Sequence, residues 1–208
     1  MSAVILILFS LALCGAVRFM GALFGLLGYV AMSAMLMTRL PLMADIPIDV
    51  FGLRSNFGCL LFVPVLFSSA IATLRYGRVE AWVDTKAVFG TVLCGTAIFV
   101  LVHVSDFGGG TAEGHFRALI PGAARVVAAS FLAFWFANGV TIFVAGRTHS
   151  GVYGQLAGQV VDSLIFFPIA FSHVEGFDLL TAAASGTAIK CGIALLTCPL
   201  LLGVRRKV

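Results

Sequence analysis

Charged residues are scarce in this sequence. Only 11% of its 208 residues are Asp, Glu, Lys or Arg, whereas 61% are apolar. A soluble globular domain is expected to have about 25% charged and about 45–50% apolar residues, so this chain has too few charges to cover a surface in water. Its thirteen basic side chains are scattered between apolar runs and form no stripe for nucleic acid. The composition excludes soluble enzymes and nucleic-acid-binding proteins and predicts an integral membrane protein.

The residues that build nucleotide and metal sites are also few. Lys86, Lys190 and Lys207 are the only lysines and none follows a glycine, so the phosphate-binding loop of ATPases is missing. The five cysteines lie in apolar stretches, and the four histidines form no i, i+4 pair. We therefore expect no disulfide framework, no metal site and no other cofactor. His149 and Ser150 adjoin in a short loop without an oriented acid, so we expect no enzyme.

Long apolar runs take up most of the chain. A membrane-spanning helix needs about 20 apolar residues. We expect an all-α polytopic membrane protein, a single domain over residues 1–208 with six core transmembrane helices and an extra N-terminal helix within residues 1–18. The predicted spans are 3–17, 20–38, 57–74, 87–104, 123–146, 153–172 and 179–203.

The first apolar run allows other interpretations. It could be a signal peptide, or the first arm of a hairpin that turns at Arg18. No Lys or Arg precedes the run. Residues 11–14, Leu-Ala-Leu-Cys, resemble a lipoprotein cleavage site, but Leu13 before Cys14 is not the small residue that such a site requires. An extra helix is therefore favoured over a signal peptide, while the choice between six and seven spans stays open.

Basic residues predict the orientation. Cytoplasmic loops of membrane proteins carry an excess of Lys and Arg. Residues 205–207 and the loop 75–86 are basic, whereas the loop 173–178 has no Lys or Arg. We therefore expect a cytoplasmic C-terminus, with the N-terminus outside if there are seven spans and inside if there are six.

Two charged residues lie inside apolar spans instead of beside them. Asp162 and Lys190 are near the midpoints of the last two spans. A charge at the bilayer centre costs about 2.5–3.5 kcal/mol on insertion scales, so charges kept at this depth usually mark function. Consecutive spans run antiparallel, which places the two midpoints at one depth. We expect the two side chains to pair or to share a polar cavity; a purely stabilising ion pair is the alternative.

Polar residues flank this pair. Gln159, Ser163 and Phe166 share a helix face with Asp162 because their spacing is i, i+4, i+7 around it. An amide, a carboxylate, a hydroxyl and an aromatic ring suit a flat heterocycle that forms hydrogen bonds. The preceding span presents a second polar face. Its first member, Arg125, lies so near the membrane surface that snorkelling to that surface explains its position equally well. The members of that face are Arg125, Ser130 and Asn138.

Prolines interrupt two of the predicted spans. Proline has no N–H to donate to the carbonyl four residues earlier, so Pro64 frees the carbonyl of Leu60 and Pro168 frees that of Leu164. Each proline predicts either a simple bend or a gate.

The polar helix resembles that of a known family. Residues 158–171, Gly-Gln-Val-Val-Asp-Ser-Leu-Ile-Phe-Phe-Pro-Ile-Ala-Phe, closely resemble the signature helix of the bacterial queuosine-precursor transporter family, formerly catalogued as vitamin-uptake transporters. Other places are similar to the family as well, and the resemblance covers roughly residues 30–205. These places are Ala124-Arg125 with Ala129-Ser130-Phe131, Tyr76-Gly77-Arg78 with Gly58, and Lys190 with Pro199.

The resemblance implies an importer of 7-cyano- or 7-aminomethyl-7-deazaguanine in the bacterial inner membrane. It implies that Gln159 and Asp162 bind the edge of the base, that Phe166 stacks on its face and that Lys190 balances Asp162. The remaining substrate-binding residues would be Ser163, Ser130, Asn138 and Arg125.

A second hypothesis is that the chain is the substrate-binding membrane subunit of an energised multi-subunit importer. Gly21, Gly25 and Gly28 form a face of small residues that could dock a partner helix. As partners we expect a small-molecule deazapurine and the lipid bilayer, no nucleic acid, and either a second copy of the chain or importer subunits.

Overall fold

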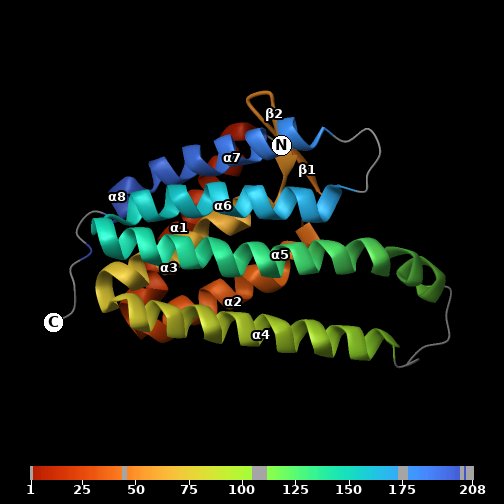
Figure 1. Ribbon diagram of the computed structural model, residues 1–208, viewed down its shortest axis with the longest axis horizontal. Coiled ribbons are helices and arrows are strands. Elements are labelled where there is room, and N and C mark those ends of the chain that lie inside the picture. The colour runs from red at the N-terminus through yellow and green to blue at the C-terminus, as the bar shows by residue number, and fades with distance from the viewer. Residues whose placement is uncertain (1, 44–45, 105–111, 173–177, 202–203, 205–208) are drawn as a thin grey trace.

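Seven long helices form one bundle in the computed structural model of the chain (Figure 1). The structure describes all residues except 1, 44–45, 105–111, 173–177, 202–203 and 205–208. The chain is an all-α polytopic membrane protein, as predicted. The long helices, followed by a short one, are α1 (Ala3–Phe24), α2 (Leu26–Met43), α3 (Gly58–Tyr76), α4 (Arg78–Val104), α5 (Ala112–Thr148), α6 (Gly151–Phe171), α7 (Leu179–Leu196) and α8 (Cys198–Leu201).

Consecutive long helices pack side by side and run in alternate directions (Figure 1). Five of the described helical segments are long and apolar enough to cross a membrane: α1, α3, the part of α5 from Arg125 to Thr148, α6 and α7. We call the end of the bundle near the start of α3 the hairpin end, and the end that carries α8 the C-terminal end. The start of α1 and α8 lie at opposite ends of the bundle.

The first helix is longer than predicted. α1 continues through Arg18, whose guanidinium donates a hydrogen bond to the carbonyl of Leu200. The helix does not turn at this charge, which another part of the chain binds. α1 ends at Phe24, where Gly25 adopts a φ of 65° that favours glycine. The predicted boundary at residue 18 and the hairpin turn at Arg18 are therefore wrong.

The glycines predicted to dock a partner are used within the chain. A Cβ at Gly21 would collide with the ring of Tyr29, and one at Gly28 would collide with the carbonyl of Met20. Both glycines are buried, and they let α1 and α2 approach closely beside their turn. A docking face built on Gly21 and Gly28 is thus ruled out.

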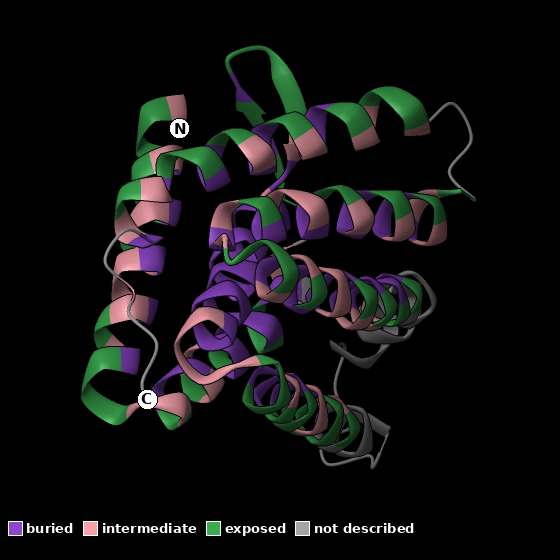
Figure 2. Cartoon of the chain, turned by 60° about the vertical axis from the view of Figure 1, so that its left-hand side comes forward, coloured by how far each residue is buried: buried purple, intermediate pink, exposed green. Residues whose placement is uncertain are grey.

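α3 lies at the centre of the bundle. Its residues 58–73 are all buried (Figure 2), and it contacts every other long helix. Pro64 leaves the carbonyl of Leu60 without its helical donor, and the hydroxyl of Ser10 on α1 donates to this carbonyl at 2.9 Å. The acceptor that the sequence predicts to be free is therefore bound by α1, which ties α1 to the core.

A β-hairpin that the sequence analysis did not predict connects α2 and α3. Strand β1 (Pro47–Val50) pairs antiparallel with β2 (Leu53–Asn56). The turn residues Phe51 and Gly52 have φ values of 54° and 84°, as two-residue hairpin loops prefer. β2 contacts both α3 and α7. The hairpin therefore packs against two of the helices that carry the site described next.

Candidate binding site

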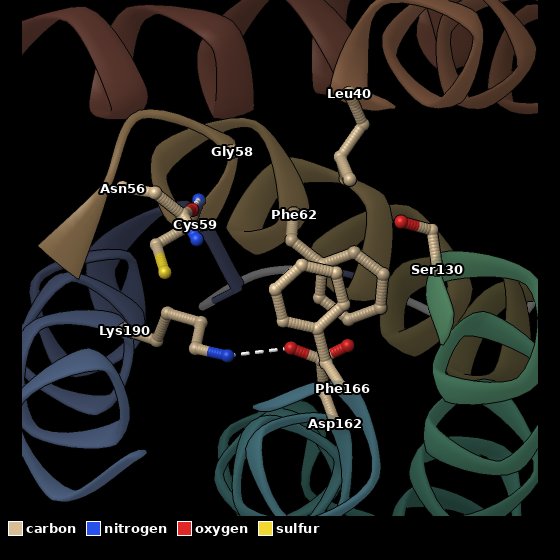
Figure 3. A pocket seen from close by; sticks show the side chains of 9 residues that line it. All are labelled: Leu40, Asn56, Gly58, Cys59, Phe62, Ser130, Asp162, Phe166 and Lys190. Carbon is tan, nitrogen blue, oxygen red and sulfur yellow. Dashed lines mark hydrogen bonds and ion pairs between the residues drawn. The ribbon is translucent and has the colours of Figure 1, made fainter. Parts of the chain in front are cut away.

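Asp162 and Lys190 form a buried ion pair in the middle of the bundle (Figure 3). Each is the twelfth residue of its helix, α6 or α7, so the antiparallel packing of these helices brings them to one depth. Lys190 Nζ lies 2.5 Å from Asp162 Oδ2, and the two side chains are 1% and 7% exposed. The predicted pairing of Asp162 with Lys190 is confirmed.

Helix capping fixes the position of Lys190 along α7. The carboxylate of Asp178 accepts a hydrogen bond from the backbone N–H of Thr181 at 3.1 Å, which satisfies a donor in the first turn of the helix. The hydroxyl and backbone N–H of Thr181 hold the pKa of Asp178 below its usual value. The helix therefore begins at Leu179, three turns before Lys190.

Aromatic rings surround the ammonium group of Lys190. Its Nζ lies 6.0 Å from the centre of the Phe62 ring and 5.9 Å from that of Phe167, within range of cation–π attraction. An ammonium and a carboxylate removed from water depend on each other, because each partner is costly to bury alone. The pair is thus a concentrated polar centre inside apolar walls.

A small cavity adjoins the ion pair. Its volume is about 10 Å³, the space of roughly one water molecule. Figure 3 shows the rings of Phe62 and Phe166 and the side chain of Leu40 among the apolar groups that line the cavity. This conformation is closed to any larger ligand. The lining residues come from five helices and β2: Leu40, Asn56, Gly58, Cys59, Phe62, Ser130, Asp162, Phe166 and Lys190.

Four of the eight predicted site residues line this cavity: Ser130, Asp162, Phe166 and Lys190. Gln159 and Ser163 do not line it, although both are fully buried on the same helix as Asp162. The structure therefore brings six of the predicted residues into one buried region.

Asn138 and Arg125 are placed differently. Asn138 is fully buried, but its amide donates to the carbonyl of Phe134 at 2.8 Å and accepts from the hydroxyl of Ser69. Both ends of this side chain are therefore engaged within the protein. Arg125 is exposed and does not line the cavity. Neither residue offers a polar group to a ligand at the ion pair in this conformation.

Several buried polar atoms beside the pair lack partners. Among the described residues, neither amide atom of Gln159 is hydrogen-bonded, and the hydroxyls of Ser130 and Ser163 are also without partners. Within the residues that the structure describes, Asp162 accepts a hydrogen bond only from Lys190. A buried polar group left without a hydrogen bond costs about 1–3 kcal/mol. Ser130 and Asp162 line the small cavity, whereas a polar ligand would reach Gln159 and Ser163 only if the site opened.

The wall of the site that β2 and α3 provide was not predicted from the sequence. Asn56 carried a usable signal, because an Asn before an apolar run often begins a helix. Its side-chain oxygen accepts the N–H of Cys59 at 3.1 Å, which starts α3 and directs Cys59 and Phe62 toward the pair. Leu40 offered no such signal, because its position depends on how α2 packs.

A second, larger cavity lies at the C-terminal end of the bundle. Its volume is about 290 Å³. Between the two cavities lie buried polar side chains, among them Ser69 on α3, Thr141 on α5 and Gln155 on α6. Along α3 and α5, Ser69 and Thr141 lie between residues that line the small cavity and residues that line the large one, and we call this set of buried polar side chains the polar seam. The cavity is lined by Thr73, Leu74, Gly77, Arg78, Ala145, Gly146 and His149.

Comparison with protein families adds to this geometry. The profile of the family described as "Putative vitamin uptake transporter" matches residues 56–204. The chain belongs to this family. The matched segment of this vitamin uptake transporter family member begins at the end of β2 and contains every residue of the small cavity except Leu40. No curated protein and no solved structure matches the chain.

Family membership and the apolar helices together make the chain a multi-pass membrane protein of a transporter family. The family description names vitamins as the transported class and names no reaction. The buried polar region between α3, α5, α6 and α7 is therefore a candidate site for a small vitamin-like substrate.

Proposed function

We propose that this transporter carries a 7-deazaguanine precursor of queuosine, the 7-cyano or 7-aminomethyl form, and binds it at Asp162 and Lys190. The observation that carries the proposal is the carboxamide of Gln159. It is fully buried within one turn of Asp162, and neither its nitrogen nor its oxygen has a partner among the described residues. A ligand with both donors and acceptors would satisfy it.

The chemistry of a guanine-type ring fits these groups. Its edge carries adjacent N–H donors beside a carbonyl oxygen. The carboxylate of Asp162 is purely an acceptor and can take the donors, while the amide of Gln159 or the ammonium of Lys190 can donate to the carbonyl. Phe62 and Phe166 supply ring faces on which a planar base can stack. A bare ion or a lipid chain would not need this combination of groups.

Transport requires the small cavity to open. A space of about 10 Å³ cannot hold a bicyclic base, so we take this conformation as the closed one. Opening toward the hairpin end would separate Phe62, Phe166 and Leu40. Opening toward the C-terminal end would join the pair to the 290 Å³ cavity through the polar seam. With the predicted cytoplasmic C-terminus, this sequence of openings imports the base.

Uptake in a bacterial strain that cannot make the precursor tests the proposal. Cells expressing the wild-type chain and supplied with the base should regain queuosine in their tRNA. Asp162→Asn and Lys190→Ala should reduce this at least tenfold, since a hydrogen bond to a charged group contributes about 1.5–3 kcal/mol. Leu164→Ala, on the exposed face of α6, is the matched control and should keep full uptake. Unchanged queuosine in both site variants at equal expression would refute the site.

The purified chain in liposomes separates a solitary transporter from an importer subunit. We expect the chain alone to exchange labelled base across the membrane. Exchange that appears only after importer subunits are added would instead favour the multi-subunit hypothesis. A second copy of the chain as partner stays a prediction, tested by measuring the mass of the active particle.

A further inference from the structure

Asp84 is a buried carboxyl group that the substrate site does not use. It lies in the second turn of α4 and is 1% exposed. Ala81, Val88 and Val92, at helical spacing around it, are also buried. Asp84 therefore belongs to the face of α4 that packs into the bundle, where an apolar residue would be expected.

No described side chain neutralises Asp84. α4 packs against α2, α3 and α5, whose described cations and tyrosines within those helices are Tyr29, Arg39, Arg75, Tyr76, Arg125 and Arg147. None of these side chains makes an ion pair or hydrogen bond with Asp84. On α4 itself, Arg78, Glu80 and Lys86 make none with it either. The Oδ1 atom of Asp84 is buried without a partner in the described part of the chain.

A carboxylate in such surroundings is unstable, because an apolar interior disfavours an unpaired charge and the group takes up a proton instead. We propose that Asp84 binds the proton that drives transport. In the closed conformation it is a neutral carboxylic acid. When its surroundings open to water it gives the proton to a water molecule and becomes a carboxylate. This inference rests on the proposed transport function.

The position of Asp84 links it to both cavities. It lies six residues beyond Arg78, or about 9 Å along the helix, and Arg78 lines the cavity at the C-terminal end. The helices that pack on α4 carry Leu40, Phe62 and Ser130 of the small cavity. A movement of α2, α3 or α5 relative to α4 would therefore also change the packing around Asp84.

The same surroundings favour a proton over a metal cation. Among the described residues, no group of three or more His, Cys, Asp or Glu side chains could hold a metal ion. A divalent cation such as calcium needs about six to eight oxygen ligands, whereas a proton needs one carboxylate. Asp84 alone is sufficient for the coupling that we propose.

Gradient-driven uptake into liposomes containing the purified chain tests the proposal. With labelled 7-deazaguanine base outside, an inward proton gradient should make wild-type liposomes accumulate the base several-fold. Asp84→Asn, which mimics the protonated acid, should lose this accumulation but keep exchange of base for base, because exchange moves no net proton. Glu80→Gln, an exposed acid one turn away on α4, is the control and should behave as wild type.

Two results would overturn the proposal: accumulation by Asp84→Asn equal to wild type, or accumulation driven by a sodium gradient and not by a proton gradient. Failure of the wild type to bind or exchange the base would instead refute the proposed substrate.

Thermal unfolding of the purified protein from pH 5 to 9 then tests Asp84 without substrate. A group that holds a proton only when folded makes the protein less stable as pH rises. Wild type should lose more stability over this range than Asp84→Asn, and equal profiles would contradict the proposal.

Discussion

At the scale of single residues, the Asp162–Lys190 pair is the most demanding feature of the molecule. Two charges removed from water lose their hydration, and their mutual attraction often does no better than an apolar pair of similar size. The pair here is almost fully buried, with aromatic rings on two sides of the ammonium. The substrate-binding role that we propose for the pair would explain why these charges are kept at this depth.

Removing one partner should destabilise the protein more than removing both. Asp162→Leu or Lys190→Met leaves an unpaired buried charge, and we expect each to cost about 3–5 kcal/mol of unfolding free energy. The double variant leaves no charge and should recover most of this loss. Thermal or denaturant unfolding in detergent measures all three proteins. A double variant as unstable as the sum of the single ones would show that the two side chains act independently.

At the scale of helices, α5 and α6 have the most extensive contact of the described elements and pack closely. A Cβ at Gly154 would lie 2.7 Å from both the Cβ of Ala145 and the carbonyl oxygen of Thr141, distances that no real Cβ tolerates. Gly158, one turn later, likewise lacks room beside Thr141. This spacing of two glycines four residues apart lets helix backbones approach closely. It fixes α6, and with it Asp162, against α5.

Two alanine substitutions should have opposite effects on stability. Gly154→Ala should push α6 from α5 and destabilise the protein by about 1–3 kcal/mol. Gly192→Ala, on α7 with no atom within 4 Å of the new Cβ, should stabilise it by about 0.5–1 kcal/mol because alanine favours the helix. Unfolding in detergent compares the two variants. A stabilising effect of Gly154→Ala would contradict the close α5–α6 packing.

The helices could be predicted from sequence where a single physical signal was sufficient. Apolar length predicted α6 and α7, and the matching depths of Asp162 and Lys190 predicted their contact. Arg18 was misleading, because a charge that suggests a turn is instead bound by the carbonyl of Leu200. Asn56 offered a local signal as the start of α3, but the position of the hairpin beside the site depends on packing against α3 and α7, which no local pattern encodes.

At the scale of the whole molecule, the chain is a closed bundle with a polar seam between two cavities of unequal size. The small cavity touches the ion pair, and the large one lies at the C-terminal end. The N-terminal helix α1 is joined to the rest of this bundle by two hydrogen bonds. The hydroxyl of Ser10 donates to the carbonyl of Leu60 in α3, and the guanidinium of Arg18 donates to the carbonyl of Leu200. The N-terminal helix is thus part of the structural core.

Seven helices running in alternate directions predict that the two ends of the chain lie on opposite sides of the membrane. The basic residues 205–207 predict a C-terminus in the cytoplasm. A reporter fused at residue 2 should therefore be active only outside, and one fused after residue 208 only in the cytoplasm. Reporters that are active on the same side would contradict the seven-span topology.

Thermal unfolding of the purified protein with added bases tests the substrate site most directly. A ligand present at 100 times its Kd stabilises the folded state by about 2.7 kcal/mol. We predict that 7-cyano- and 7-aminomethyl-7-deazaguanine raise the Tm of the wild type more than guanine does, since guanine lacks the substituent at position 7, and that they leave the Tm of Asp162→Asn unchanged. A wild-type Tm that no deazaguanine raises, or an equal rise in Asp162→Asn, would contradict the assignment of this site.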